Sequence, residues 1–346
     1  MEYTKEEALR LLNAEGQELE RLYDEADRIR RENMGDEVYI RGIIEFSNIC
    51  RNDCLYCGIR ASNKNVKRYT LPADEIFHVV KSMVNSRVGT VVLQSGEATV
   101  FGDEEMGKLI RKIKDETGLS ITVSVGNRPF EVYRYWRDCG MDRYLLRFET
   151  SDPRLFERLH PACTLEERLT CLGYLKELGI QAGGGFMIGL PGEPIEVLAE
   201  NILLCRKLDL DMIGIGPFIP HPDTPLGNEK NAYEGKEEMF FKALAVLRIF
   251  NPDAHIPATT AFDTVFSGVG RNLALQRGAN IFMPNNTPTL YRKDYLLYPG
   301  KPGVDERAEQ CVGSAVVRIE SLGRLVGAGP GHSRKARYRD QHEGTS

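Results

Sequence analysis

The chain has 346 residues, of which 42% are apolar and 27% are charged, and its formal net charge is -5 at pH 7. This composition is ordinary for a globular protein of one large or two small domains, and the negative charge excludes nucleic acid as an expected partner. No apolar run approaches the ~18 to 20 residues of a membrane helix and no signal-peptide pattern opens the chain, so we expect a cytoplasmic protein without membrane contact.

Two helical patterns come first. One begins with the capping-box sequence Thr4-Lys-Glu-Glu7, and the other runs from Glu18 to Asn33 with apolar residues at spacings of three and four. Gly35 ends the second pattern. We expect residues 1–37 to form a helical segment that lies as a lid over one end of the main domain.

Eight short apolar runs follow, each bounded by Gly, Pro, Asn or Asp. They span residues 38–46, 89–95, 120–125, 144–149, 181–190, 212–219, 255–261 and 279–284. Because most are apolar throughout instead of alternating, both faces of the sheet should be buried, as in a parallel sheet. Eight such units predict an α/β fold with a complete (β/α)8 TIM-type barrel over residues 38–300. An open doubly wound sheet is the alternative.

Helical patterns lie between most of these runs, at residues 72–85, 102–115, 130–139, 164–178, 195–207 and 236–250. Residues 301–346 form a C-terminal extension with one more predicted helix at 307–322. The extension continues through the glycine-rich turn 327–331 into the basic stretch 333–339. We interpret that stretch as a solvated tail, because runs of like charge more often lie in solvent than form a binding patch.

Three cysteines follow the first predicted strand with the spacing C-x3-C-x2-C, at Cys50, Cys54 and Cys57. Thiols so spaced on one loop can converge on a small site, as the ligands of an iron-sulfur cluster must. A 4Fe-4S cube held by three cysteines keeps one iron open for a substrate or cosubstrate. Structural zinc, which takes four ligands in paired spacings, fits poorly, and disulfides are not expected in an intracellular chain.

Polar residues at the carboxyl ends of the strands are candidates for the active site of a parallel barrel. The second strand ends in Gln94-Ser-Gly96-Glu97, where Gly96 permits close approach and Glu97 can accept from an ammonium group. The fourth strand carries Arg147 and Glu149 on one face. These two charges either form an internal ion pair or meet a charged ligand.

Further candidates lie on later segments. Arg168 has a guanidinium fork that suits a carboxylate, and the alternative is a solvated arginine on a helix surface. The glycine-rich run 183–192 lacks the ending of a phosphate loop and favours close approach of a ligand to the backbone. Thr259 and Thr260 would help to close the floor of the pocket.

The cysteine loop resembles the signature of the radical S-adenosylmethionine (SAM) superfamily, in which SAM chelates the open iron of a 4Fe-4S cluster and is cleaved reductively to a 5'-deoxyadenosyl radical. An aromatic residue precedes the last cysteine in that signature, as Tyr56 does here, and its backbone reaches the adenine. Gly96 and Glu97 match a Gly-Gly-Glu-like motif that binds the amino group of SAM, and Arg168 is the candidate for its carboxylate. The resemblance implies both cofactors.

Longer strings resemble the HydE family of FeFe-hydrogenase maturases. They are Gly35-Asp-Glu-Val, Ile44-Glu-Phe-Ser-Asn, Val92-Leu-Gln-Ser-Gly-Glu, the run from Gly214 to Leu226, Ile256-Pro-Ala-Thr-Thr-Ala and Tyr298-Pro-Gly-Lys. The resemblance implies a barrel with a closed internal cavity, with SAM at the top and the substrate reached from below. It also implies that Glu149 and Arg168 hold SAM, with Tyr295 nearby. The residues that it places in the lower cavity are Arg147, Thr122, Thr259 and Thr260.

The same resemblance implies an organometallic iron-cysteine substrate with CO and cyanide, processed toward the di-iron subcluster of the hydrogenase. It implies an electron donor such as ferredoxin or flavodoxin, and contact with other hydrogenase maturases. Some HydE proteins bind a second cluster through three C-terminal cysteines. Here only Cys311 remains, with Gly303 and Ser314 at the other positions, so no second cluster is expected.

Two alternative functions stay open. One is a related radical SAM enzyme that acts on an amino acid or another small molecule, as methylornithine synthases do. The other is a non-catalytic iron-sulfur carrier. Glu97, Glu149 and Arg168 argue against the carrier, because a carrier needs no pocket for an amino acid.

Overall fold

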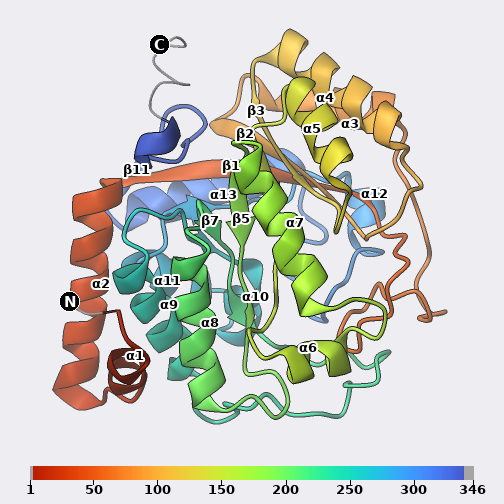
Figure 1. The fold of residues 1–346 in the computed structure, drawn as a ribbon. Helices are drawn as coiled ribbons and strands as arrows, with labels where there is room; N and C mark the ends of the chain where they lie inside the picture. Colours follow the sequence, from red (N-terminus) through yellow and green to blue (C-terminus); the bar gives the residue numbers. More distant parts are fainter. Residues whose placement is uncertain (1–2, 339–346) are drawn as a thin grey trace.

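Parallel strands surrounded by helices form the body of the protein in the computed structural model, which describes residues 3–338 (Figure 1). The strands are β1 (Glu37–Ser47), β2 (Val88–Ser95), β3 (Ser120–Ser124), β4 (Arg143–Leu145), β5 (Gln181–Gly184), β6 (Met187–Ile188), β7 (Met212–Ile213), β8 (Gly216–Pro217), β9 (Pro257–Ala258), β10 (Ile281–Phe282) and β11 (Leu325–Val326). All eight predicted runs therefore contain a strand, and the two runs richest in glycine, at 181–190 and 212–219, are each split in two.

The strands form a nearly closed ring. Neighbours pair in parallel in the order β7-β5-β4-β3-β2-β1-β10-β9. Between the two end members, a single parallel bridge joins Met212 to His255. There the amide of Ile213 donates to the carbonyl of His255 (2.8 Å), and the amide of His255 donates to that of Asp211 (2.9 Å). An open doubly wound sheet would keep these two ends apart, so that alternative is wrong.

The helices are α1 (Lys5–Leu12), α2 (Gly16–Met34), α3 (Ala73–Met83), α4 (Asp103–Thr117), α5 (Phe130–Asp138), α6 (Pro153–Leu159), α7 (Leu165–Glu177), α8 (Ile195–Lys207), α9 (Glu238–Phe250), α10 (Thr260–Val265), α11 (Gly270–Gln276), α12 (Thr289–Arg292) and α13 (Ala308–Ser321). The predicted helices are all present. The sequence did not predict α6, α10, α11 and α12, because helices of one or two turns are too short to show a period. Within residues 3–338, no helix has the length and apolar character needed to cross a membrane.

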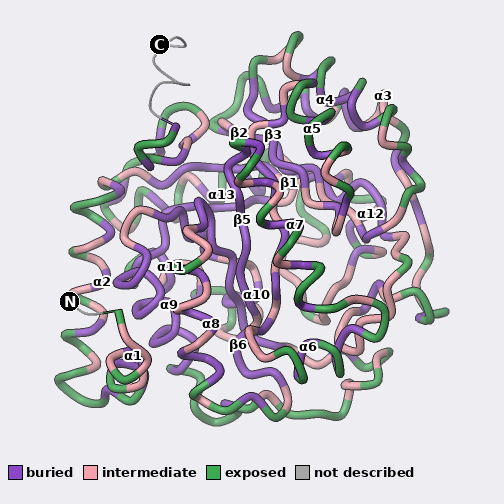
Figure 2. Tube along the Cα trace, viewed as in Figure 1, coloured by how far each residue is buried: buried purple, intermediate pink, exposed green. Residues whose placement is uncertain are grey.

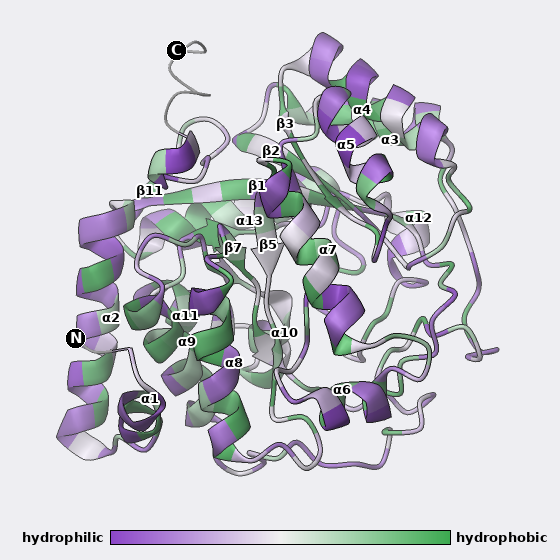
Figure 3. Cartoon of the chain, viewed as in Figure 1, coloured by the Kyte–Doolittle hydropathy of each residue, from purple (hydrophilic) through white to green (hydrophobic). Residues whose placement is uncertain are grey.

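The N-terminal helices pack on the side of the barrel. In Figure 1 they lie beside α8 and α9, and the contacts agree, since α1 touches α8 and α9 while α2 runs along α9. Every residue of α9 from Met239 to Phe250 is buried, and the helix is hydrophobic around much of its surface (Figures 2 and 3). A helix between a barrel and a second helical layer has no solvent face. The predicted lid is therefore wrong.

The C-terminal chain crosses the amino ends of the strands. We call residues 327–338 the floor segment. A Cβ atom at Gly89 would lie 1.8 Å from the carbonyl oxygen of Gly329, so only glycine lets β2 approach the segment this closely. Arg41 and Thr90 donate to the carbonyls of Gly331 and Pro330, both at 3.0 Å. The segment thus covers the interior of the barrel from below.

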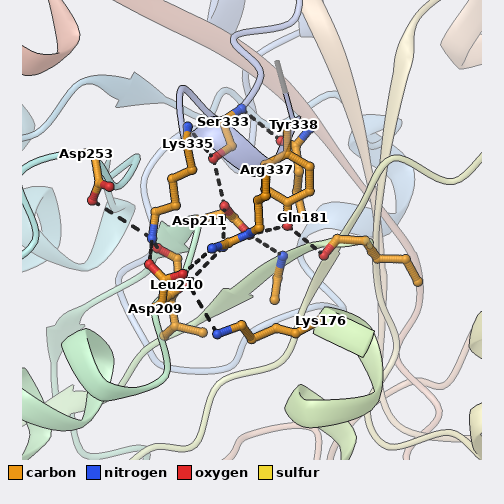
Figure 4. Close-up of polar contacts among 12 residues, drawn as sticks. Lys176, Gln181, Asp209, Leu210, Asp211, Asp253, Ser333, Lys335, Arg337 and Tyr338 are labelled. Carbon is orange, nitrogen blue, oxygen red and sulfur yellow. Dashed lines mark hydrogen bonds and ion pairs between the residues drawn. The ribbon is translucent and has the colours of Figure 1, made fainter. Parts of the chain in front are cut away.

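The basic stretch is part of this floor. Figure 4 shows Lys335 and Arg337 pointing at Asp209 and Asp211, the two carboxylates that precede β7. Ser333 donates to Asp211 at 2.7 Å. The interpretation of residues 333–338 as a solvated tail is therefore wrong, because acidic partners far away in the sequence compensate the cations. Residue 339 lies outside the described residues.

Candidate active site

The three cysteines lie on a loop between β1 and α3, residues 48–60, which we call the cluster loop. Their thiols are half-buried. Burial raises the pKa of Cys54, and the thiols of Cys57 and Cys50 raise it further. Burial also raises the pKa of Cys57 to about 12, again with a contribution from Cys50. Each thiolate thus disfavours its neighbours, and a cationic iron centre would remove that repulsion.

A site for one metal ion and a site for an iron-sulfur cluster require different arrangements of the ligands. Within the described chain, no group of three or more His, Cys, Asp or Glu side chains is arranged to hold one metal ion. In a 4Fe-4S cube, each thiolate binds its own iron, so the sulfur atoms do not converge on one point. Three thiols near enough to raise one another's pKa remain candidates for the three ligands of such a cube.

Two glycines let other segments touch the cluster loop. A Cβ atom at Gly96 would lie 2.4 Å from the carbonyl oxygen of Ile49 and 2.8 Å from Cβ of Cys50. One at Gly58 would lie 2.1 Å from the carbonyl oxygen of Leu296. The close approach predicted for Gly96 is thus present, and it joins the end of β2 to the cluster loop.

Glu97 follows directly and is buried. Its Oε1 accepts from Arg51 at 2.8 Å, and its Oε2 accepts from the backbone amide of Asn127 at 3.0 Å. The guanidinium of Arg168 lies 3.8 Å from Oε2. A carboxylate has about four acceptor positions, so Glu97 retains capacity for an ammonium group beside these partners.

Arg168 lies in the first turns of α7 and is only 8% exposed. The alternative of a solvated surface arginine is therefore wrong. Its Nε has no hydrogen-bond partner among the described residues. A buried guanidinium with an open donor leaves a polar group unsatisfied, which a bound carboxylate would correct.

Arg147 and Glu149 form the internal ion pair that the sequence left open. Nη2 of Arg147 lies 2.9 Å from Oε2 of Glu149. The two atoms are not aligned as a hydrogen bond, and both lack such a partner within residues 3–338. Glu149 also has a φ of +64°, which is uncommon outside glycine and strained. The placement of both residues on the fourth strand is wrong, because β4 ends at Leu145. Strain and unsatisfied charge together mark the segment after β4 as a candidate binding site.

Tyr56, on the cluster loop, lies near Glu149. Burial raises the pKa of its hydroxyl, and the carboxylate of Glu149 is the next cause. The hydroxyl lies 2.8 Å from Nε2 of His160. Burial lowers the pKa of His160 to about 4, so this ring is neutral at pH 7. No sequence pattern pointed to His160, because this residue follows α6, a helix too short to predict.

The four residues assigned to the lower cavity are not all in contact. Thr122 is buried on β3, and its hydroxyl has no partner in the described part of the chain. Thr259 donates to the carbonyl of Ile215 (2.8 Å), and the hydroxyl of Thr260 pairs with that of Tyr298 (2.6 Å). Arg147 instead forms the ion pair with Glu149 described above.

Tyr295 is buried, and its hydroxyl accepts from Gln94 at 3.3 Å. This contact places Tyr295 against the end of β2, close to Gly96 and Glu97. Sequence reasoning missed a buried ion pair beside it, between Glu45 and Lys301. No local pattern could have found this pair, because its partners are far apart in the chain.

Known proteins resemble this chain in sequence. The family model described as "Radical SAM superfamily" matches residues 44–205. The "[FeFe] hydrogenase maturase subunit HydE" of Thermotoga maritima is 48% identical over 308 residues, which cover 89% of this chain and 87% of that protein. The 3-methylornithine synthase of Methanosarcina acetivorans is 28% identical over 319 residues, 90% of this chain and 87% of that one.

A solved structure shows the same architecture. The crystal structure of methylornithine synthase (PylB) superposes with a TM-score of 0.81 at 26% identity, covering 94% of this chain and 95% of that one. The match over 94% of this chain shows that its fold is shared with a solved protein.

Proposed function

Because this chain belongs to the HydE family of radical SAM enzymes, we propose that it cleaves SAM reductively and acts in assembly of the FeFe-hydrogenase di-iron subcluster. The observation that carries the proposal is the meeting of three clustered thiols with a set of charges suited to an amino acid. The thiols are Cys50, Cys54 and Cys57, and the charges are those of Glu97 and Arg168. An iron-sulfur carrier would need the thiols but not these charges.

Each residue has a role that follows from its chemistry. Cys50, Cys54 and Cys57 would hold a 4Fe-4S cluster, which supplies the electron that breaks a carbon-sulfur bond of SAM. Glu97 accepts from the amino group of SAM, and Arg168 donates its open Nε to the carboxylate.

The other residues that we assign to SAM lie close to the cluster loop. Gly96 keeps the end of β2 against the loop. Tyr56 would present its backbone to the adenine, as the resemblance to the radical SAM signature implies. Glu149, four residues after the end of β4, would bind the same cofactor, and Tyr295 would lie beside it. The unsatisfied atoms of Glu149 support this assignment.

The substrate site lies lower in the barrel. We assign Arg147, Thr122, Thr259 and Thr260 to an organometallic iron-cysteine substrate, whose carboxylate suits a guanidinium and hydroxyl groups. The support is the unpartnered hydroxyl of Thr122 and the unaligned guanidinium of Arg147. An electron carrier such as ferredoxin or flavodoxin would reduce the cluster. Other maturases would exchange substrate and product with this protein. A reducing cytoplasm would keep the thiols unoxidised.

Residues 38–300 would form a complete (β/α)8 barrel, with residues 1–37 and 301–346 as additions to it. The Met212–His255 bridge supports closure of the ring. The contacts of the floor segment with β1 and β2 support treating the extension as a cover on the barrel.

The test is anaerobic. The protein is reconstituted with iron and sulfide, reduced and given SAM, and 5'-deoxyadenosine and iron are counted; about four irons per chain are expected from one cube. Maturation is then tested by activation of an FeFe-hydrogenase in a system that lacks HydE. A filled cluster without any cleavage, with candidate substrate present, would contradict the enzyme assignment.

A second candidate is an enzyme that acts on an amino acid, as the fold of methylornithine synthase superposes over almost the full chain. The same reconstituted protein, incubated with free amino acids, would then form a product such as 3-methylornithine. Mass spectrometry distinguishes the two candidates, because only the first predicts hydrogenase activation without an amino-acid product.

A further inference from the structure

A buried ion pair links the C-terminal extension to the first strand. Lys301 donates to Oε1 of Glu45, which lies near the carboxyl end of β1, and the two side chains are only 8% and 4% exposed. The other oxygen of Glu45 accepts from the amide of Asn285 at 2.9 Å. Burying two charges costs about as much desolvation energy as their attraction returns, so stability alone explains such a pair poorly.

The ammonium of Lys301 also faces an aromatic ring. It lies 5.4 Å from the centre of the Tyr295 ring, within range of a cation-π contact. The hydroxyl of Tyr295 accepts from Gln94, two residues before Gly96. Lys301 therefore contacts both strands whose ends meet at the cluster loop, directly at β1 and through Tyr295 at β2.

The chain between these residues rests on the cluster loop. We call residues 294–301 the clamp segment. The amide of Gly58, next to Cys57, donates to the carbonyl of Leu297 at 3.0 Å, and the carbonyl of Leu296 occupies the space where Gly58 has no Cβ. The clamp segment thus presses on the loop directly after its last cysteine.

Both ends of the clamp segment are fixed to β1 and its continuation. At one end, the side-chain amide of Asn48 donates to the carbonyl of Asp294 at 2.6 Å. At the other end, Lys301 pairs with Glu45. A segment held at two points and pressed on a loop restricts that loop more than one contact could.

We propose that Lys301 is a positioning residue, which with Glu45 holds the clamp segment against the cluster loop and so fixes Cys57 and Tyr295 relative to the SAM-binding end of β2. The inference rests on the proposed function of that end. Lys301 need not touch SAM, since it acts through Tyr295 and the backbone of residues 295–297.

The experiment compares four variants. K301M leaves Glu45 buried without its cation, E45Q/K301M removes both charges, and K301R keeps the charge. K335M is the matched control, because Lys335 is equally buried and pairs with Asp209 at the opposite end of the barrel. Hydrogen exchange of residues 54–60 is measured in cluster-free protein, and SAM affinity and the KM and kcat for SAM cleavage in reconstituted protein.

The double variant should bind SAM about tenfold more weakly, the effect of losing one interaction of ordinary strength, and exchange faster at residues 54–60. Its KM should rise more than its kcat falls, and K301R should restore both. K335M should leave exchange in the cluster loop and SAM affinity as they are in the wild type.

Two results would overturn the inference. One is a double variant with wild-type SAM affinity and wild-type exchange at residues 54–60, because the pair would then be structural only. The other is a K335M variant with the same defects as K301M, which would show that any buried pair has this effect. If the wild type itself binds no SAM, the proposed function fails, and the exchange measurement still decides whether Lys301 holds the loop.

Discussion

The two ends of the barrel differ in how many hydrogen bonds their buried charged groups form. At the amino ends of the strands, Asp211 accepts from Ser333 (2.7 Å), Arg337 (3.0 Å), Tyr338 (2.9 Å) and the amide of Ala182 (2.9 Å). This end is closed by the floor segment, and its central carboxylate uses both oxygens (Figure 4).

At the carboxyl ends, several buried groups lack partners among the described residues. They include atoms of Arg147, Glu149 and Arg168. A buried polar atom without a hydrogen bond costs free energy, which a bound ligand would recover. One such atom, Nε of Arg41, also lies at the lower end. The comparison teaches that the lower end serves stability and the upper end serves binding.

The largest effect should follow Cys54→Ala. This change removes a cluster ligand at the upper end, so we expect loss of the cluster and of SAM cleavage, with most of the fold retained because the loop lies outside the barrel core. Iron content, absorbance and circular dichroism check it. Cys311→Ala is the control and should keep about four irons per chain. Full cluster absorbance in the Cys54 variant would contradict the assignment of Cys54 as a cluster ligand.

At the lower end, Asp211→Ala should lower the free energy of unfolding by about 3 kcal/mol, because it removes one carboxylate partner of Arg337 and the acceptor of the Ser333 hydroxyl and the Ala182 amide. Urea denaturation measures the change. The folded fraction should bind SAM as the wild type does. Asp253→Ala removes a half-exposed carboxylate 3.9 Å from Lys335 and should have little effect. Weak SAM binding by folded Asp211→Ala would contradict the division between the two ends.

Arg168→Lys tests the upper end without removing charge. An ammonium cannot replace the guanidinium fork, so SAM affinity should fall about tenfold while stability changes little. Calorimetry with reconstituted protein measures the affinity. Unchanged affinity would reject the assignment of Arg168 to the carboxylate of SAM.

The smallest effect concerns pH. Because burial lowers the pKa of His160 to about 4 from 6.5, the unfolded chain takes up a proton first as the pH falls. The contribution of His160 to stability is therefore complete above pH 6.5 and is lost as the pH falls toward about 4, with about 1 kcal/mol gone between pH 7.5 and 5.5.

His160→Asn should reduce this dependence, as measured by urea denaturation at the two pH values. His78→Asn, a change on the exposed face of α3, is the control and should keep it. If the free energy of unfolding of the His160 variant depends on pH as that of the wild type does, the protonation of His160 is not the cause of this dependence.

Much of the fold followed from local pattern. Continuous apolar runs predicted eight strands, and regular spacing predicted every helix longer than two turns. The cluster loop was also a local feature, since Cys50, Cys54 and Cys57 lie within eight residues. Gly96, Glu97 and Arg168 were found because of their positions relative to predicted strands and helices.

Some interpretations failed where a partner lay far away. The basic stretch 333–338 was expected in solvent, yet Asp209 and Asp211, over a hundred residues earlier, bind it. Arg168 could have been solvated, and only the packing of α7 buries it. No local pattern connects Lys301 with Glu45 or Tyr56 with His160.

The sequence by itself therefore determined the class of fold and the cluster loop, because periodicity and spacing are properties of neighbouring residues, and its longer strings carried the resemblance to the family. Only the tertiary structure decided which charges are compensated and which remain open. That outcome depends on the burial of a group and on partners from distant segments, and both arise only when the ring of strands brings those segments together.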